Sequence, residues 1–318
     1  MHYDVFNGDA DGILALLQLR LAEPRKSTLI TGVKRDIELL QQVPSTIASS
    51  VTVLDISMEK NLEPLNTLLT NNIDVFYVDH HRSGDIPNSD KLTAIINTDA
   101  NICTSLLVNQ YLGGKFALWA IVAAFGDNMM AAAEKLSTQC GLSLNQQEQL
   151  KALGIYINYN GYGRTVVDLH IHPRQLFQTL LAYPDPFTLI AEPGSLYTQL
   201  ERAYLADMKL ANNAKTLFES SELQVLELEN AAWSRRVSGV FGNELANKSP
   251  EKAHAVLTLN SDNSYLVSLR APLKNKQGAG DICAQFETGG GRAGAAGINR
   301  LPQEKLGNFI DLVSKYYQ

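Results

Sequence analysis

The sequence predicts an α/β fold with two domains: an N-terminal doubly wound, mostly parallel sheet and a smaller C-terminal α/β domain, joined by a helical linker. Short apolar runs of strand length alternate with segments whose apolar residues recur at helical spacing. The 318 residues also suffice for two hydrophobic cores. The expected boundaries are 1–190 for the first domain, 191–222 for the linker helix and 223–318 for the second domain.

Composition narrows the classes of function. A net charge of −6 and a pI of about 5.6 argue against broad binding to duplex DNA, which needs an extended basic face. The three cysteines, Cys103, Cys140 and Cys283, show neither a disulfide framework nor zinc-type spacing, which suits a reducing compartment. No leader pattern opens the sequence, and no apolar run reaches the ~18 residues that span a membrane. We therefore predict a cytoplasmic protein without a membrane partner.

The first predicted strand, Tyr3–Phe6, runs into the turn Asn7-Gly8-Asp9-Ala10-Asp11-Gly12, after which Ile13–Leu21 shows helical spacing. The order Asp-x-Asp-Gly occurs in EF-hand calcium loops, but the later Glu that such a loop needs is missing. Two interpretations stay open. The segment is a turn made of turn-forming residues, or Asp9 and Asp11 direct two carboxylates into one site.

The alternation of strands and helices continues along the first domain. We expect strands at Ser27–Thr31, Val51–Leu54, Val75–Val78 and Thr93–Ile96, and helices near Arg35–Gln42, Leu62–Leu69, Ala100–Tyr111, Phe116–Phe125, Ala132–Leu142 and Asn145–Leu153.

Acidic residues and histidines follow these elements. Asp55 comes directly after the third strand, Asp79-His80-His81-Arg82 comes directly after the fourth, and Gly126-Asp127-Asn128 ends a helix. An Asp–His pair at one strand end is more commonly a structural hydrogen bond than a metal site, and Gly126 suits a helix terminus. However, the carboxyl ends of parallel strands meet at one edge, where open α/β sheets bind ligands. Several such ends therefore favour a shared site.

The second half of the chain has a different texture. Asn, Gly, Tyr and Pro punctuate Asn158–Pro193, where His170 and His172 alternate as on a strand and are interpreted mainly as surface or substrate-lining residues. Ser195–Ser220 is expected to be one long amphipathic helix. Strands are expected at Leu223–Leu228, Ala255–Leu259 and Tyr265–Leu269.

Candidate anion-binding residues follow the last of these strands. Arg270 is followed by a loop with Lys274 and Lys276, for which a solvated surface loop is an equal interpretation. Further on, Gly289-Gly290-Gly291 precedes Arg292. Glycines let backbone N–H groups approach an anion closely, and Arg292 adds a planar fork for phosphate.

These motifs resemble a known family. Asp9-x-Asp11-Gly12, Asp55, Asp79-His80-His81 and Asp127 are similar, in order and spacing, to the four motifs of the DHH phosphoesterases. Gly289–Gly297 resembles the glycine motif of the DHHA1 domain that follows in many members. The resemblance covers nearly the whole chain and is strongest to short stand-alone DHH–DHHA1 proteins, which hydrolyse short oligoribonucleotides and linear dinucleotides, including pGpG.

The resemblance implies two Mn²⁺ ions, with Mg²⁺ as an alternative, since carboxylates with one imidazole suit such ions. It implies that Asp11, Asp55, His80 and Asp127 hold one ion, that Asp9 and Asp55 hold the other, and that Asp55 bridges the two. It also implies that His81 and Asp55 take part in catalysis. Expected supporting residues are Asp79, Asn7 and Asn128, and expected substrate-binding residues are Arg82, Arg270, Lys274, Gly289, Gly290, Gly291 and Arg292.

Two departures from the family pattern stand out. Many relatives have a metal-binding histidine four residues before the first Asp of motif I, where this chain has Val5. One metal site is therefore weakened, or completed by Asn7 or water. The glycine motif commonly ends in histidine, where this chain has Arg292, which keeps a cation for phosphate or a guanine edge.

The expected function is a phosphodiesterase that cleaves a linear dinucleotide or a very short oligoribonucleotide to 5′-mononucleotides, with pGpG from cyclic di-GMP turnover as the leading substrate. One alternative is a polyphosphatase or pyrophosphatase. The other is a nucleotide sensor that has lost turnover, which the missing motif-I histidine favours. Base preference, linear against cyclic substrates, and the homodimer as oligomeric state stay open.

Overall fold

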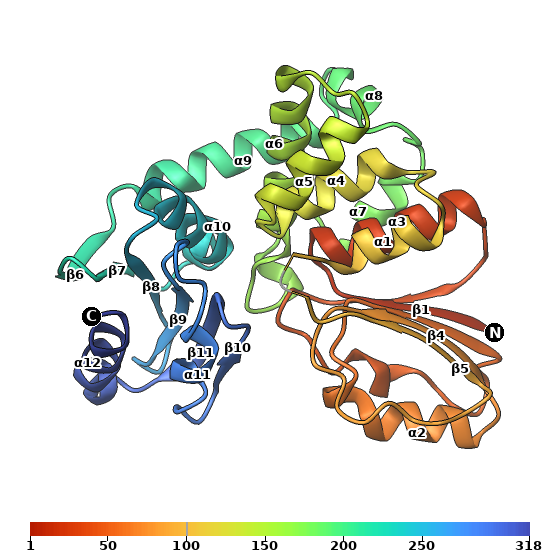
Figure 1. The fold of residues 1–318 in the computed structure, drawn as a ribbon, viewed down its shortest axis with the longest axis horizontal. Coiled ribbons are helices and arrows are strands. Elements are labelled where there is room, and N and C mark those ends of the chain that lie inside the picture. The colour runs from red at the N-terminus through yellow and green to blue at the C-terminus, as the bar shows by residue number, and fades with distance from the viewer. Residues whose placement is uncertain (100) are drawn as a thin grey trace. The chain divides into compact units, whose positions relative to one another are not determined.

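The computed structural model describes residues 1–99 and 101–318, and the chain divides into two units, Met1–Arg202 and Ala203–Gln318. Helix α9, Leu196–Ala211, crosses this boundary (Figure 1). The single helix predicted for Ser195–Ser220 is wrong beyond Ala211. Two asparagines, which favour turns, follow α9. The next segment pairs with Leu223–Leu228 as an edge strand, and its Leu217 and Phe218 pack against the core of the second unit.

The first unit is built on five parallel strands. They are β1 (His2–Phe6), β2 (Thr28–Ile30), β3 (Ser50–Leu54), β4 (Asp74–Asp79) and β5 (Leu92–Ile96), in the order β2-β1-β3-β4-β5. The predicted α/β class and all five predicted strands of this sheet are confirmed. The chain reverses its direction of winding between β1 and β3, so the loops after these two strands diverge and leave room for a ligand.

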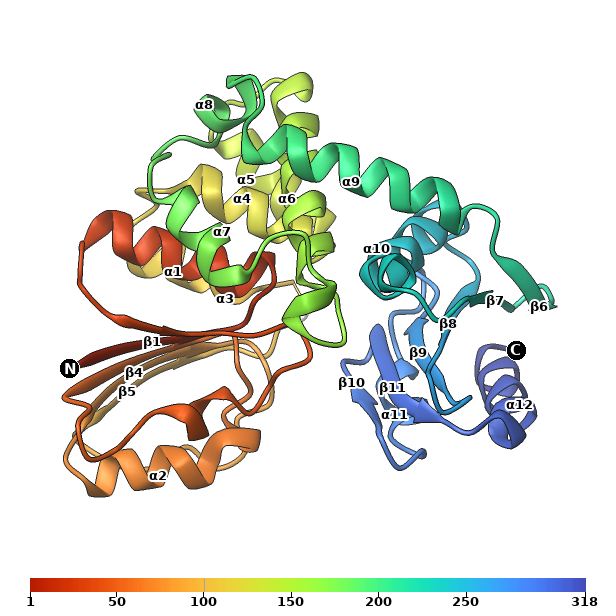
Figure 2. The same cartoon turned by 180° about the vertical axis from the view of Figure 1, so that it is seen from behind.

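Helices cover both faces of this sheet (Figures 1 and 2). One face carries α2 (Leu62–Thr70), and the other carries α1 (Ala10–Ala22), α3 (Thr104–Tyr111), α4 (Ala117–Gly126), α6 (Leu144–Gly161) and α7 (Pro173–Leu180). Along β1 the side chains alternate: Tyr3 and Val5 join the core on the α2 side, and Phe6 packs on Phe177 of α7.

The remaining elements of the first unit include several departures from the predicted pattern. They are α5 (Met130–Gln139), α8 (Pro186–Ala191) and the 3₁₀ turns Leu39–Gln42, Glu59–Asn61 and Val166–Asp168. The helix predicted near Arg35–Gln42 is only the first of these turns, because the Asp36 side chain accepts a hydrogen bond from the backbone of Val33 and forms a turn instead. Ala100, the predicted start of a helix, lies outside the described residues.

The segment that was expected to be irregular is partly helical. Helix α6 continues through Tyr156–Gly161, because its Tyr and Asn side chains are buried against the rest of the unit despite their low helix propensity. His170 and His172 do not lie on a strand. His172 instead caps α7, with its ring accepting a hydrogen bond from the backbone of Arg174 at 3.1 Å.

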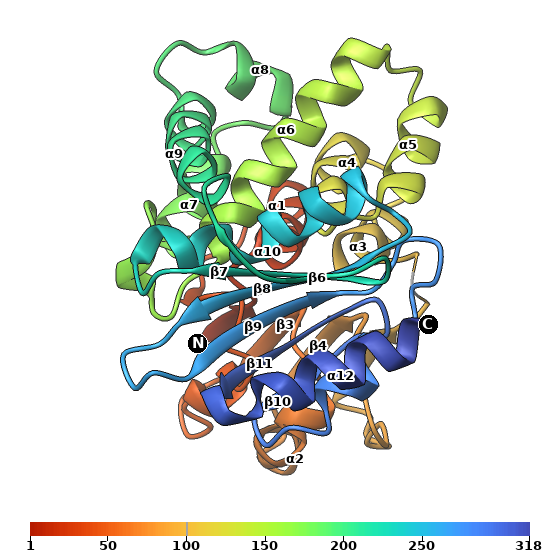
Figure 3. The same cartoon turned by 90° about the vertical axis from the view of Figure 1, so that its left-hand side faces the viewer.

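The second unit is a six-stranded sheet in the order β10-β11-β9-β8-β7-β6. Its strands are β6 (Lys215–Glu219), β7 (Leu223–Leu228), β8 (Ala253–Leu259), β9 (Tyr265–Arg270), β10 (Gly289–Gly291) and β11 (Ala295–Leu301), and all neighbours are antiparallel except β7 and β8. Helix α10 (Ala232–Lys248) lies on one face, and α11 (Ala279–Cys283) and α12 (Leu306–Tyr317) lie on the other; the 3₁₀ turn Gln303–Lys305 precedes α12 (Figure 3). In the described part of the chain, no helix is both long and apolar enough to cross a bilayer.

A buried polar cluster ties β1 to α1. The Asp4 carboxylate is fully buried and accepts hydrogen bonds from Arg20 Nε at 2.9 Å and from Ser27 Oγ at 2.6 Å, and His2 Nε2 lies 3.0 Å from it. Burial raises the pKa of Asp4, but the bonds to Arg20 and His2 outweigh this effect and bring the pKa to about 2. Folding therefore favours the ionised carboxylate.

We expect Asp4→Asn to lower the free energy of unfolding of the first unit at neutral pH by about 2 kcal/mol through the lost charge alone. The folded-state pKa lies below the ~3.9 of an unfolded aspartate. The contribution of Asp4 is therefore complete above about pH 4 and is lost as the pH falls toward 2. Urea denaturation can be followed by Trp119 fluorescence in a Trp233→Phe background, since the chain has two tryptophans.

The matched control for this prediction is Asp85→Asn, because Asp85 is exposed in the same unit. Its stability should follow that of the unsubstituted protein at every pH. The role of Asp4 would be refuted by a stability difference for Asp4→Asn that stays constant from about pH 6 to about pH 2.5.

Candidate metal centre

The turn after β1 places two aspartates at the start of α1. Asp9 is the N-cap of α1: its Oδ1 accepts hydrogen bonds from the backbone N–H groups of Asp11 at 3.0 Å and Gly12 at 3.1 Å. The Asn7 side chain accepts from the Asp9 N–H at 3.1 Å. A side chain at Gly12 would clash, since its Cβ would come within 2.4 Å of the Asn7 carbonyl oxygen. The predicted Asp-x-Asp-Gly turn thus has a structural reason for its glycine.

Asp11 connects this turn to α3. Its two carboxylate oxygens accept from the backbone N–H groups of Thr104 at 2.8 Å and Ser105 at 2.7 Å, in the first turn of α3. The Ser105 hydroxyl donates back to the Asp11 carbonyl at 2.8 Å. The N-terminal end of a helix stabilises a buried negative charge. Asp11 is therefore stabilised by backbone N–H groups, and among the described residues no lysine or arginine forms an ion pair with it.

Asp55 follows β3 in an unusual backbone conformation. Its φ of 58° lies in the left-handed region, which a residue other than glycine adopts rarely. The side chain is buried, and the Thr104 hydroxyl donates to its Oδ1 at 3.2 Å. The pKa of Asp55 lies well above its usual range because the carboxyl group is buried, and because Asp11 and Asp9 place further negative charge beside it. The site thus has an excess of negative charge.

His80 points a ring nitrogen at these carboxylates. Its Nδ1 lies 2.9 Å from the carbonyl oxygen of Ile102, and because a carbonyl only accepts, Nδ1 carries the proton and donates. The other ring nitrogen, Nε2, lies 3.4 Å from Asp55 Oδ1 and 3.8 Å from Asp11 Oδ2. These atoms offer one imidazole nitrogen and two carboxylate oxygens to a cation.

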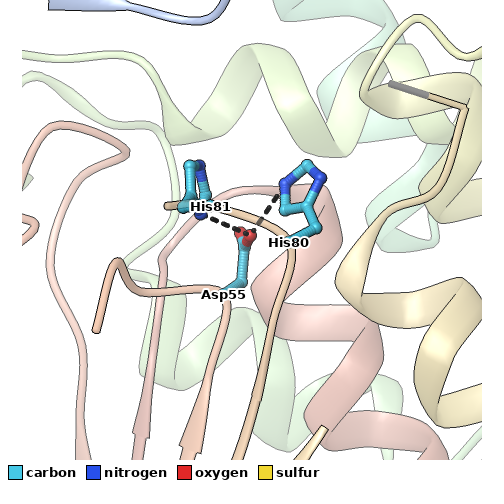
Figure 4. Close-up of side chains that lie close together, drawn as sticks. All are labelled: Asp55, His80 and His81. Carbon is cyan, nitrogen blue, oxygen red and sulfur yellow. Dashed lines mark ion pairs between the residues drawn. The ribbon is translucent and has the colours of Figure 1, made fainter. Parts of the chain in front are cut away.

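His81 is oriented by Asp79. The His81 Nδ1 lies 2.8 Å from Asp79 Oδ1. It also lies 3.8 Å from Asp55 Oδ1, and Figure 4 shows His80 and His81 on either side of this carboxylate. The other oxygen of the fully buried Asp79 has no hydrogen-bond partner among the described residues. Since the His81 side chain is about one-third exposed, its remaining ring nitrogen is available to a ligand, and Asp79 sets the direction of the ring.

Asp127 reaches the same region from α4. It is the C-cap of that helix, and Asn128 follows with a left-handed φ of 61°, which asparagine tolerates. Glycines let α4 pack closely on α6: a Cβ at Gly154 would come within 2.1 Å of the Val122 carbonyl oxygen. The Asp127 carboxylate lies 3.5 Å from Nζ of Lys34, a cation that the sequence analysis did not single out.

Lys34 also forms an ion pair with Asp9 Oδ2. Burial raises the pKa of Asp9, but the Lys34 ammonium outweighs this effect, and the pKa lies below its usual range. The available signal was the position of Lys34 shortly after the second predicted strand, beside Gly32. A lysine in that place is too common to identify a site from sequence alone.

The donor set fits a divalent cation. Ligand atoms of Asp55, His80 and His81 lie within 4.8 Å of one another, although Asp79 engages one nitrogen of His81. Carboxylate oxygens with one or two imidazoles suit Mn²⁺ or Mg²⁺, and the His80 N–H on a backbone carbonyl is the usual arrangement behind a metal-binding histidine. Asp11 borders this group, with its Oδ2 lying 3.8 Å from His80 Nε2. Each Asp11 oxygen accepts one backbone N–H, whereas Asp9 Oδ1 accepts two and Asp9 Oδ2 contacts the Lys34 ammonium.

The predicted substrate-binding residues lie in different settings. Arg82 is exposed in the loop that follows β4, and Lys274 forms an exposed ion pair with Glu251. Gly289–Gly291 is not a loop but the edge strand β10, and Arg292 begins the tight turn between β10 and β11. The glycines are needed there in part for packing, since a Cβ at Gly289 would come within 1.8 Å of the Cys283 carbonyl oxygen.

Arg270 is the predicted residue with the most distinctive environment. It is 9% exposed, and its guanidinium donates to the Ser268 hydroxyl at 3.1 Å and to the carbonyl oxygens of Leu269 and Gly239, each at 3.1 Å; Asn243 accepts from its Nε. All these acceptors are neutral, and within the described chain no carboxylate forms an ion pair with it. A buried cation without a counter-charge attracts an anion.

Comparisons with known proteins agree on the fold. The sequence matches no protein-family model and no curated protein. Among solved structures it is similar to a manganese-bound RecJ exonuclease (TM-score 0.57, 15% identity, covering 99% of this chain and 89% of that one) and to a pGpG-specific phosphodiesterase, PggH, from Vibrio cholerae (0.51, 14%, 99% and 98%). It is also similar to an exopolyphosphatase-related protein from Bacteroides fragilis (0.51, 13%, 99% and 92%). The chain therefore has the fold of these proteins.

We expect His80→Ala to weaken Mn²⁺ binding by roughly 100-fold or more and Asp79→Asn to weaken it less, because loss of a direct ligand costs more than loss of an orienting partner, which is typically ~10–100-fold. Isothermal titration with Mn²⁺ measures both. The matched control is His170→Ala, which changes an exposed histidine of the same unit and should leave binding unchanged. Weaker binding by Asp79→Asn than by His80→Ala would make Asp79 itself the ligand.

Proposed function

We propose that the protein is a divalent-metal-dependent hydrolase of phosphate esters. The observation that carries this proposal is the convergence of buried side chains at one sheet edge, where His80 Nε2 lies 3.4 Å from Asp55 Oδ1 and 3.8 Å from Asp11 Oδ2. This arrangement favours binding of a cation, and it lies at the edge of the sheet where α/β proteins bind ligands. The fold, shared with a manganese-bound exonuclease and a phosphodiesterase, supports the same reaction class.

The residues of the site have separable roles in this proposal. Asp55 and His80 hold the metal ion, with Asp11 and Asp127 beside it. A bound divalent ion would supply Lewis acidity toward a phosphoryl oxygen and toward a water molecule. His81, which Asp79 orients through a 2.8 Å contact, exchanges a proton with the leaving oxygen through its other ring nitrogen.

The finer proposal is a phosphodiesterase for linear dinucleotides or very short oligoribonucleotides, with pGpG as the leading substrate. Similarity to the pGpG-specific enzyme over 99% of this chain and 98% of that one supports it. The second unit offers cations of the required kind, the buried Arg270 and the half-buried Arg292. A guanidinium is suited to bind a phosphate or the edge of a guanine.

A substrate screen tests the proposal. The protein with Mn²⁺ is incubated with pGpG, other linear dinucleotides, cyclic di-GMP and polyphosphate, and the products are separated by chromatography. We expect 5′-mononucleotides from the linear dinucleotides, no reaction with EDTA, and loss of turnover in Asp55→Asn. Phosphate release from polyphosphate alone would replace the proposed substrate by the one suggested by the exopolyphosphatase-related fold neighbour. Binding of pGpG without turnover would indicate a sensor.

We expect Arg292→Ala to lower kcat/KM for pGpG by roughly 10- to 100-fold, because a charge-assisted hydrogen bond contributes ~1.5–3 kcal/mol and ~1.4 kcal/mol corresponds to a factor of ten. Hydrolysis of bis-p-nitrophenyl phosphate, which has no distal nucleotide, should change little. Arg292→Lys distinguishes charge from the planar fork.

The control for Arg292 is Arg300→Ala, which removes an exposed arginine on β11 that pairs with Asp262. It should leave both substrates unaffected. Equal slowing of both substrates by Arg292→Ala would remove Arg292 from substrate recognition and assign it to the catalytic centre or to folding.

A further inference from the structure

Lys34 lies inside the acidic cluster rather than on the surface. It follows β2, its side chain is 22% exposed, and its ammonium contacts Asp9 Oδ2 and lies 3.5 Å from Asp127 Oδ1. The ammonium also lies over the ring of Tyr162, 5.5 Å from the ring centre. A lysine held between two carboxylates neutralises part of their negative charge and stabilises their arrangement.

The backbone of Lys34 is fastened to the same turn that carries Asp9. The Lys34 N–H donates to the Gly161 carbonyl at 2.9 Å, and its own carbonyl accepts from the Asn7 side chain at 3.1 Å. The same Asn7 accepts from the Asp9 N–H. Asn7 therefore bridges the two residues, and the distance between their backbones is set by hydrogen bonds rather than by the ion pair alone.

Close backbone packing holds this arrangement. A Cβ at Gly8 would come within 1.8 Å of the Gly32 carbonyl oxygen, and a Cβ at Gly161 would come within 2.9 Å of the Asp9 Cα. Three chain segments thus meet at three glycines, Gly8, Gly32 and Gly161. The Lys34 backbone has little room to withdraw from Asp9 without unpacking the turn.

Asp9 has no oxygen left that is free of protein donors. Its Oδ1 accepts from Asp11 N and Gly12 N, at 3.0 and 3.1 Å, and its Oδ2 contacts the Lys34 ammonium. A divalent ion bound by Asp9 would have to displace that ammonium, and two cations cannot share the space. The sequence analysis assigned Asp9 and Asp55 to a second ion, and β1 adds no ligand there because Val5 is fully buried in the apolar core.

We propose that the Lys34 ammonium takes the place of a second divalent ion, so that each chain binds one ion, at the Asp55 and His80 end of the cluster. This inference rests on the proposed metal centre. It specifies how many ions that centre binds and assigns the limit to Lys34. Lys34 supplies a positive charge beside Asp9 and Asp127. The lysine ammonium is a compact point charge, as a metal ion is.

The number of bound ions tests the inference without reference to activity. Equilibrium dialysis of the whole protein against Mn²⁺ should give one ion per chain, and electron paramagnetic resonance should show an isolated ion without magnetic coupling to a neighbour. Lys34→Gln, which removes the positive charge beside Asp9 and Asp127, should bind a second ion coupled to the first. Lys34→Arg, which keeps the charge, should bind one.

The control variant is Lys91→Gln, which breaks a lysine–aspartate pair on the surface of the same unit, where Lys91 Nζ lies 3.2 Å from Asp74; it should keep one ion. Two coupled ions in the unsubstituted protein would overturn the inference and leave the proposed function standing. One ion in Lys34→Gln, with its circular dichroism unchanged, would also overturn it. No Mn²⁺ bound by the unsubstituted protein would refute the proposed function itself.

Discussion

The constraint on which the site depends is the accumulation of buried negative charge at one edge of a parallel sheet. Parallel pairing of β1, β3 and β4 brings the carboxyl ends of these strands to the same edge, where the chain carries Asp9, Asp55 and Asp79. Carboxylates this close repel one another, and burial strengthens the repulsion. The surrounding elements are arranged largely to offset this cost. The start of α1 binds Asp9, the start of α3 binds Asp11, and Lys34 lies between Asp9 and Asp127.

Asp55 is where this compensation is least complete. Among the described residues it accepts a hydrogen bond from the Thr104 hydroxyl and otherwise faces the two histidines, while Asp11 and Asp9 hold its pKa well above the usual range after burial has raised it. Its left-handed backbone adds strain of roughly 1–3 kcal/mol, a cost that folded proteins retain mainly at functional positions. Strain and uncompensated charge therefore coincide at one residue. A cation bound at Asp55 would reduce the repulsion between the carboxylates and offset the energetic cost of the left-handed backbone.

Much of this architecture was readable from the sequence. Apolar runs bounded by turn residues predicted the five strands of the first sheet, and the residues at their ends predicted which side chains would meet, since parallel strands share an edge. The irregular elements could not be predicted from the sequence. Burial of the Tyr and Asn side chains near Gly161 keeps α6 helical where propensity predicts a break, and Gly289–Gly291 pairs as an edge strand although its composition indicates a loop. These outcomes depend on tertiary contacts that no local pattern encodes.

The position of Lys34 in the site could not be predicted from the sequence either, because it depends on contacts with residues distant in sequence. It meets Asp127 across 93 positions, and its backbone is held by Gly161 and by Asn7. The sequence did show the complementary fact: Val5 occupies a strand position where relatives of the family it resembles have a metal-binding histidine. An apolar residue there leaves Asp9 with a charge to neutralise and one fewer ligand with which to recruit an ion. An ammonium needs no ligands besides the carboxylates themselves, so a lysine satisfies that charge where an incomplete coordination shell does not.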